Sequence, residues 1–358
     1  MARDYEKKKY FHKNYRAILL TCLLVMLFYL SPSFAAANTP ITTSPPSVNV
    51  LTWWGYLDPP WVKPLIEQTC HVKLSYDEYY MTDEFLRRWD DYKNNYDIVI
   101  FYDVMYNSIK NDLEGKSKHN LSAQAKDYYP AIRDHFYQQH FLNNTAYLFP
   151  GIPGILWNPK NIQINPTDNL YQIFHKAGDH IAILLDDAIS ANALFNTYHD
   201  FDPFALNKIR QNTRLYIANA YDNLVNNENF AFAFSDSGVA LQEVALSHGN
   251  LVFTTLPAFL FNSSDLIAQL NDEPSTTCVA DLLSSRSFLN RLQKDTYFFS
   301  PYGDIPQTGD KAYLDAYRQY LAELPKMTWM PLFTNQEYEA INNWWQLMKI
   351  NAGEQTLG

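Results

Sequence analysis

The sequence lacks the short motifs that most often identify an enzyme. It contains no G-x-S-x-G, P-loop, G-x-G-x-x-G or H-E-x-x-H pattern, so no motif points to a serine hydrolase, an NTPase, a dinucleotide enzyme or a zinc protease. Its 11 glycines follow no G-X-Y period, which excludes a collagen-like chain. The histidines are scattered without the spacing of metal ligands, so we predict neither a metal nor a cofactor.

Apolar and aromatic residues, by contrast, are abundant. Of the 358 residues, 47% are hydrophobic, 18% are charged and 16% are aromatic, which is typical of a globular protein. At roughly 150 residues per domain, this length predicts about two lobes, each large enough for its own core. The aromatic side chains must be buried in these cores or used in a binding site.

The first 37 residues have the pattern of an export signal. Six Lys and Arg residues precede an apolar run of 14 residues, 17–30, and alanines follow at 35–37. We predict a signal peptide over 1–37, cleaved near Ala37–Asn38, and a polar, Pro-rich linker over 38–47. The apolar run is shorter than the roughly 20 residues of a membrane span, with a retained signal anchor as the alternative. No second run of spanning length follows, so we expect a periplasmic protein.

The charge of the remaining chain is strongly negative. Without residues 1–37, 22 Lys and Arg face 36 Asp and Glu, a net charge of −14. A field of that sign repels phosphate backbones and favours cationic partners, so we predict no nucleic-acid partner. Two cysteines, Cys70 and Cys278, also remain, 208 residues apart. An oxidising compartment permits their pairing, but the sequence leaves a disulfide and two buried thiols equally open.

Alternating patterns predict two doubly wound α/β lobes joined by extended crossovers. In the first part of the chain we expect strands over 48–54, 71–76 and 96–102 and helices over 62–69 and 81–94. After the Pro- and Gly-rich crossover 147–158, the expected strands are 181–185, 229–235 and 251–260, and the expected helices 188–198 and 208–226. Three more helices are predicted over 280–295, 313–324 and 337–350. We assign 48–152 and about 257–315 to one lobe, and 153–256 and about 316–358 to the other.

Aromatic residues follow the first predicted strand. Trp53, Trp54 and Tyr56 lie where its carboxyl end is expected, and open α/β sheets bind ligands at such ends. Indole and phenol faces attract ammonium groups by about 0.5–2 kcal/mol. A place in the core is the alternative for both tryptophans. Because neighbours on a strand point to opposite faces, we expect one of them to face a cleft.

Acidic residues follow other predicted strands. Asp186 and Asp187 come directly after the strand 181–185 and begin a helix. One of them is expected to cap that helix, which leaves the other carboxylate for an ammonium group, a metal or general acid chemistry. Two further strand ends carry acids, although an ordinary loop is the alternative for each; they are Tyr102-Asp103 and Ser235-Asp236.

Four stretches of the chain resemble the bacterial periplasmic spermidine/putrescine-binding proteins, the solute receptors of polyamine ABC importers. The resemblance runs from about residue 48 to 351. It rests on LTWWGYLDPP at 51–60, YDIVIFYDVMYNSI at 96–109, YLFPGIPGILWNPKNI at 147–162 and ILLDDAISANALF at 183–195. It implies a periplasmic-binding-protein-like fold in which two lobes close on a linear polyamine, with aromatic walls beside the methylenes and acids at the amines.

Carried over by position, the resemblance places Trp53 and Tyr56 in the cleft and Asp187 at an amine. Asp265, one residue from the family's crossover acid, is expected to take that role, and Tyr302 or Tyr297 that of its late tyrosine. The sequence departs from the family at other contact positions, which are Gly55, Tyr102, Ser190, Ser235, Asn262 and Ser264. The full set of predicted ligand-binding residues is Trp53, Trp54, Tyr56, Tyr102, Asp103, Asp187, Ser235, Asp236, Asp265 and Tyr302.

We therefore predict a monomeric, non-enzymatic substrate-binding component of an ABC importer, with an inner-membrane permease as its partner and a polyamine or related small cation as its ligand. One alternative is a secreted hydrolase that uses Asp187 and a second carboxylate in an aromatic cleft, as glycosidases do. Another is a sensor or adaptor with the receptor fold that has lost polyamine binding.

Overall fold

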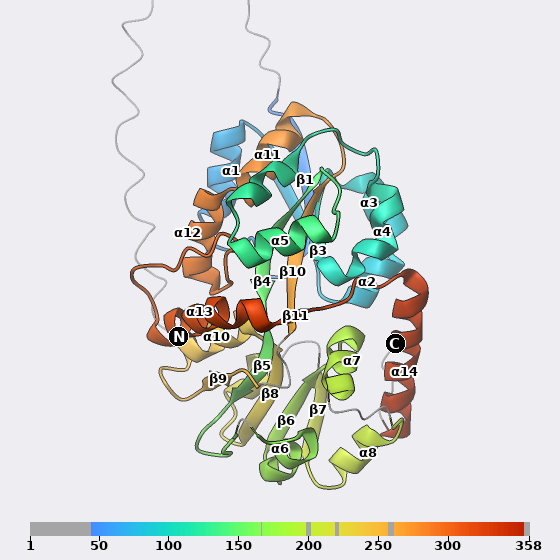
Figure 1. The fold of residues 1–358 in the computed structure, drawn as a ribbon, viewed down its shortest axis with the longest axis vertical. Coiled ribbons are helices and arrows are strands. Elements are labelled where there is room, and N and C mark those ends of the chain that lie inside the picture. The colour runs from blue at the N-terminus through green and yellow to red at the C-terminus, as the bar shows by residue number, and fades with distance from the viewer. Residues whose placement is uncertain (1–43, 166, 198–201, 219–221, 257–260, 354–358) are drawn as a thin grey trace, which may run out of the picture. The chain divides into compact units, whose positions relative to one another are not determined.

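Two β-sheets organise the part of the chain that the structure describes. The computed structural model describes residues 44–165, 167–197, 202–218, 222–256 and 261–353. From Pro45 onward the chain is one structural unit, and its two sheets lie one above the other in Figure 1. Each sheet and its helices form a lobe. The strand order of the first lobe is β11-β10-β3-β1-β2, with β4 paired to β10, and that of the second is β7-β6-β8-β5-β9. The predicted pair of α/β lobes is confirmed.

The first lobe is built from parallel strands covered by helices. Strand β1 pairs with β2 and β3 in parallel, and residues 98–101 of β3 are all buried, as expected of a strand covered on both faces. Its elements are β1 (Ser47–Trp53), α1 (Val62–Cys70), β2 (Lys73–Tyr79), α2 (Thr82–Arg87), α3 (Trp89–Asn95), β3 (Ile98–Tyr102), η1 (Asp103–Met105), α4 (Tyr106–Leu113), η2 (Leu121–Asp127), α5 (Pro130–Gln138) and β4 (Thr145–Gly151).

The chain crosses to the second lobe at Ile152, between β4 and β5. There β6 is parallel to β7 and β8, whereas β5 is antiparallel to β8. The elements are β5 (Pro153–Trp157), α6 (Leu170–Ala177), β6 (Ile181–Leu185), α7 (Ala188–Thr197), α8 (Ala205–Arg210), β7 (Arg214–Ala218), α9 (Asp222–Val225), β8 (Phe230–Asp236), α10 (Ser237–Leu246) and β9 (Val252–Thr254).

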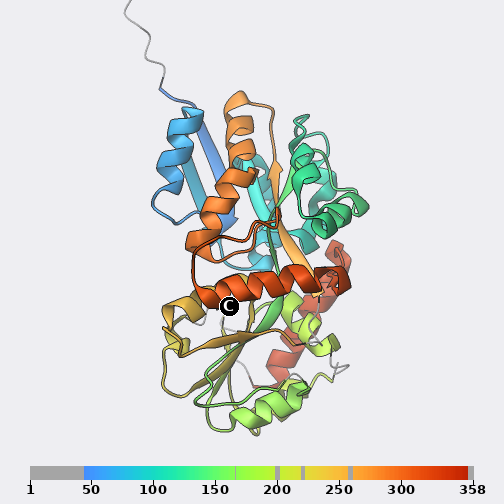
Figure 2. The same ribbon diagram turned by 60° about the vertical axis from the view of Figure 1, so that its left-hand side comes forward.

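Strand β10 (Phe261–Gln269) returns the chain to the first sheet, where it is antiparallel to β3 and β4. After it, α13 lies across the junction of the lobes, and α14 runs beside α7 and α8 of the second lobe (Figures 1 and 2). The remaining elements are α11 (Pro274–Ser284), α12 (Arg286–Thr296), α13 (Lys311–Glu323), η4 (Leu324–Lys326), β11 (Thr328–Trp329) and α14 (Asn335–Asn351).

Three predicted helices differ from the structure. The segment 208–226 contains β7, an edge strand that gains its hydrogen bonds from β6. The segment 280–295 is two helices, because Ser285 leaves the helical conformation and its Oγ caps α12 at the Phe288 N–H. The segment 81–94 is likewise divided, at Arg88.

The C-terminal part of the chain also differs from the lobe assignment made from sequence. Strand β11 lies within 316–358, which the sequence placed in the second lobe, yet it pairs with β10 of the first sheet. Tyr317 and Tyr320 of α13 are buried in the core of the first lobe. Helix α14 packs on α7 and α8 of the second lobe, and α13 also contacts α10 of that lobe.

A disulfide joins Cys70 to Cys278, which decides the question that the sequence left open. The bond connects the end of α1 to α11, two helices of the first lobe that pack against each other. Cys22 and the predicted signal peptide lie outside the described residues. Within the described residues, no helix is both long enough and apolar enough to cross a membrane.

Candidate binding cleft

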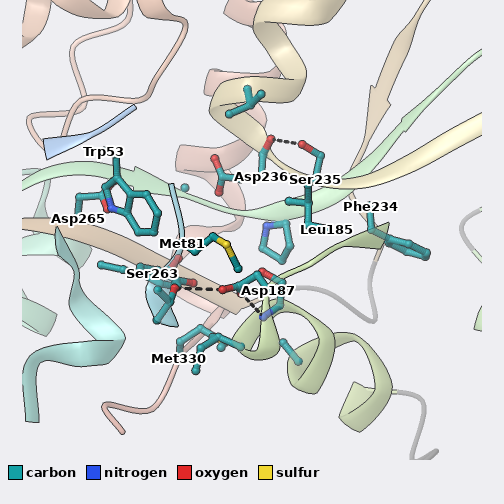
Figure 3. Close-up of a pocket in the computed structure, with 18 of the residues that line it drawn as sticks. Trp53, Met81, Leu185, Asp187, Phe234, Ser235, Asp236, Ser263, Asp265 and Met330 are labelled. Carbon is teal, nitrogen blue, oxygen red and sulfur yellow. Dashed lines mark hydrogen bonds between the residues drawn. The ribbon is translucent and has the colours of Figure 1, made fainter. Parts of the chain in front are cut away.

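A cavity of about 370 Å³ is lined by residues from both lobes. Its size falls within the range of small-molecule sites, roughly 300–1,000 Å³. The carboxyl ends of β1, β3, β6 and β8 contribute to it. Figure 3 shows the side chains of Trp53, Leu185 and Ser235 from three of these strand ends around the cavity. Of the ten predicted ligand-binding residues, eight line the cavity: Trp53, Trp54, Tyr56, Tyr102, Asp187, Ser235, Asp236 and Asp265.

Asp265 enters the cavity from an irregularity in β10. The register between β10 and β4 shifts between Ser264 and Leu266, and such a bulge redirects the side chain within it. The Tyr56 hydroxyl donates a 2.7 Å hydrogen bond to Oδ2 of Asp265. Burial raises the pKa of Asp265 to about 8. The hydrogen bond from Tyr56 lowers this pKa, and the nearby Asp236 raises it further. A neutral carboxyl is therefore favoured here until a cation arrives.

Asp236 ends β8 and caps α10. Its Oδ1 accepts a 2.9 Å hydrogen bond from the Gly238 N–H. Burial raises the pKa of Asp236 to about 6, although the N–H groups of Ser237 and Gly238 act in the opposite direction. The neighbouring strand leaves room for this carboxylate only because position 151 is glycine, where a Cβ would lie 2.7 Å from Oδ2. The half-buried Asp236 and the buried Asp265 thus form an acidic pair in the cleft, close enough for Asp236 to raise the pKa of Asp265.

Asp187 lines the cleft, but both of its oxygens already have partners. Oδ1 accepts a 2.7 Å hydrogen bond from the Ser190 N–H at the start of α7, and Oδ2 accepts a 3.0 Å bond from the Thr82 hydroxyl of the first lobe. Asp187 is therefore the helix cap, and it also joins the two lobes.

Asp186 is bound to α14. Its Oδ1 lies 2.7 Å from the Lys349 ammonium, which is largely buried, and accepts a 2.8 Å bond from the Trp345 indole N–H. The carboxylate expected to remain free after helix capping is thus neutralised within the protein.

Aromatic pairs connect the ends of β1 and β2. The parallel register places Trp53 beside Tyr79, and their ring centroids are 4.3 Å apart. One residue further on, Trp54 stacks on Tyr80 at 6.1 Å. Strand alternation predicted that only one of the two tryptophans faces the cleft, but β1 ends at Trp53 and Trp54 lies in the turn that follows. Both tryptophans line the cavity.

The described residues that line the cleft include acids but no Lys, Arg or His. In addition, no group of three or more His, Cys, Asp or Glu within the described part of the chain is arranged to hold a metal ion. The acidic pair therefore has no positive partner among the described lining residues, and a buried carboxylate without such a partner is unfavourable. A ligand that supplies positive charge fits this arrangement.

Two predicted residues do not line the cleft. Asp103 begins η1 and is buried, with Oδ2 accepting a 3.1 Å bond from the Ser264 N–H; burial raises its pKa well above the usual value. It supports the backbone beside the bulge of β10 instead of meeting ligand. Tyr302 is buried in the first lobe, where its hydroxyl donates to the Ser284 carbonyl at 2.7 Å. Both side chains are held by the core of the protein.

Other lining residues were not predicted from the sequence. Tyr80, Met81 and Thr82 follow β2, whose predicted end was residue 76. The last part of that strand was not predicted because Asp77 and Glu78 interrupt its apolar pattern. The signal available was the Tyr79-Tyr80 pair, which stands one turn before α2. Further lining residues include Phe234 of β8, Ser263 of β10 and Met330, which follows β11 (Figure 3).

The bond between Thr82 and Asp187 predicts a measurable effect on binding. Thr82→Val keeps the shape of this buried side chain and removes the hydroxyl, and hydrogen bonds to charged groups contribute about 1.5–3 kcal/mol. Because the bond joins the lobes, we expect a ligand dissociation constant about tenfold higher or more by calorimetry. Thr82→Ser, which retains a hydroxyl, is the control. Equal affinities for Thr82→Val and the original protein would show that the bond does not assist closure.

Two α/β lobes with a cleft between them define a two-lobed solute-binding fold. No protein-family model and no curated protein matches the chain. Among solved structures, a protein of Listeria monocytogenes described as a spermidine/putrescine ABC transporter superposes with a TM-score of 0.68 at 14% identity, over 85% of this chain and 99% of that one. The spermidine/putrescine substrate-binding protein PotD of Streptococcus pneumoniae has a TM-score of 0.64 at 14% identity, over 86% and 99%. A periplasmic thiamin-binding protein has a TM-score of 0.62 at 13% identity, over 87% and 97%.

The chain therefore has the fold of the substrate-binding proteins of ABC transporters. The resemblance to spermidine/putrescine-binding proteins that four sequence stretches carried is confirmed at the level of the fold.

Proposed function

We propose that this protein is the substrate-binding component of an ABC importer and that it takes a small organic cation, such as a polyamine, into the cleft between its lobes. The observation that supports this proposal most directly is the acidic pair of Asp236 and the buried Asp265, in a cavity whose described lining residues include no basic side chain. A cationic ligand supplies the missing charge and ionises both acids. Tyr56 orients Asp265 through its hydrogen bond.

The proposal includes export and a membrane partner. A disulfide between Cys70 and Cys278 suits an oxidising compartment, and the basic and apolar pattern of residues 1–37 suits a signal peptide. In this proposal the periplasmic protein acts as a monomer and delivers its ligand to an inner-membrane permease. Trp53, Trp54, Tyr56, Tyr102, Asp187, Ser235, Asp236 and Asp265 are the proposed ligand contacts.

The test combines native mass spectrometry with calorimetry. Mass spectrometry of the purified protein shows whether a small molecule is retained, and titration with putrescine and spermidine then measures affinity. We expect dissociation constants well below millimolar for at least one amine. An anionic or neutral solute bound in preference to every amine would contradict the proposal. Lysine and glucose serve as comparison solutes of different charge.

A further inference from the structure

Trp54 and Tyr80 form an exposed aromatic pair at the cleft. Both line the cavity, yet 45% of Trp54 and 57% of Tyr80 remain exposed. Large aromatic side chains in contact with each other and with a cavity, but not covered by protein, mark a surface that a ligand covers. The Trp54 N–H donates to the Tyr79 carbonyl at 3.1 Å. This bond joins the backbone at the end of β1 to that at the end of β2, where the two rings stand.

Apolar side chains from the second lobe continue this surface. The bond from Thr82 to Asp187 brings the start of α7 against the segment that follows Tyr80. Ile189 and Leu194 of α7 line the same cavity, as does Met81. This side of the cleft thus offers apolar and aromatic contacts from both lobes.

Two of the four acidic side chains that line the cleft already have partners within the protein. Asp186 is paired with Lys349, and the two oxygens of Asp187 accept hydrogen bonds from Ser190 and Thr82. Asp236 and Asp265 remain as the pair without a positive partner among the described residues of the cleft. A second ammonium group near α7 would have to compete for the Asp187 carboxylate with the Ser190 N–H and the Thr82 hydroxyl. One cationic group therefore fits this cleft better than two at opposite ends.

We propose that the ligand is a cation with a single charged group and an apolar part of about the size of a ring. Its ammonium group meets Asp236 and Asp265, and its apolar part packs on the Trp54–Tyr80 pair. This inference rests on the proposed function, since it names the class of cation that the same cleft takes. It differs from a linear polyamine in the number of charges and in the shape of the apolar part.

Four amines test the inference by calorimetry on the purified protein. Phenethylamine carries one charge and a ring, n-butylamine one charge and a short chain, putrescine two charges and spermidine three. We expect phenethylamine to bind at least about tenfold more tightly than n-butylamine and putrescine, because stacking and apolar burial both favour the ring. Tighter binding of putrescine or spermidine would overturn the inference and leave the proposed function standing. No binding of any amine would overturn both.

Variants of the aromatic pair provide the second arm. Trp54→Ala and Tyr80→Ala should each weaken phenethylamine about tenfold while n-butylamine changes less than threefold. Trp54→Phe, which keeps a ring, should recover most of the loss. Tyr137→Ala removes a similarly exposed aromatic residue that does not line the cavity and should change neither affinity. Equal losses for the two amines in Trp54→Ala and Tyr80→Ala would overturn the assignment of the ring to this pair.

Discussion

Asp265→Asn should abolish most of the affinity for a cation while making the unliganded protein more stable at pH 8. Asn has the shape of Asp and its amide oxygen still accepts the Tyr56 hydroxyl, but the charge is lost. Truncating one partner of a buried charge pair reduces binding by about 2–5 kcal/mol, or roughly 30-fold to several thousand-fold. Calorimetry with the tightest-binding amine measures this loss. Asp179→Asn, at an exposed position in the second lobe, is the control and should bind normally.

The gain in stability follows from the raised pKa. The pKa of Asp265 is about 8 in the folded protein and about 3.9 in an unfolded chain, so the folded state binds more protons between these values. The free energy of unfolding of the protein therefore falls as pH rises from about 4 to about 8. Asp265→Asn removes this contribution, and urea unfolding at pH 5 and pH 8 should show a smaller decline for the variant. A variant that loses stability at pH 8 would contradict the raised pKa.

Cation binding should show the opposite dependence on pH. Because the ligand pairs with ionised carboxylates, its affinity should rise between about pH 5 and pH 8, as Asp236 (pKa about 6) and then Asp265 (pKa about 8) lose their protons. Near neutral pH, binding should release a proton from Asp265. Titrations in buffers of different ionisation enthalpy measure that release. Asp265→Asn should remove most of it, and an equal release from the variant would assign the proton to another group.

The strand ends of the cleft could be predicted because simple periodic signals mark them. Continuous apolar runs identified β3, β6 and β8, and residues at or just beyond their ends, Tyr102, Asp187 and Asp236, line the cavity. The role of Asp265 was accessible only through the family resemblance, because a bulge in β10 depends on pairing with β4. Sequence patterns describe a single strand and carry no information on the register of its partner.

The remaining errors also have tertiary causes. Strand β7 is a short edge strand with one buried residue, Leu215, so its pattern does not differ from that of a helix. Asp103 directly follows a strand, as ligand-binding acids do, but its carboxylate accepts a hydrogen bond from the Ser264 N–H instead of facing the cleft. The sequence left open which of Asp186 and Asp187 caps the helix; Asp187 is the cap, and Lys349, 163 residues from Asp186 in sequence, binds Asp186. Partners so distant are invisible to local patterns.

Loss of the disulfide between Cys70 and Cys278 should produce the largest change in stability. The bond spans 208 residues, a stretch that contains the whole second sheet. Cross-links over long loops restrict the unfolded chain most, and removal of a native disulfide typically lowers the free energy of unfolding by about 2–5 kcal/mol. We expect a loss of that size for the double variant Cys70→Ala/Cys278→Ala, measured by urea unfolding. Ligand affinity should be retained, since neither cysteine lines the cleft.

Reduction provides the matched comparison for this prediction. The original protein, unfolded in the presence of a reducing agent, should fall to the stability of the double variant, because both chains then lack the cross-link. The variant itself should not respond to the reducing agent. A variant as stable as the oxidised protein would contradict the prediction. It would mean that contacts between α1 and α11 persist in the unfolded chain, so that the disulfide adds no further restriction. A variant that loses ligand affinity as well would instead indicate that these two helices hold the first lobe in the shape that the cleft requires.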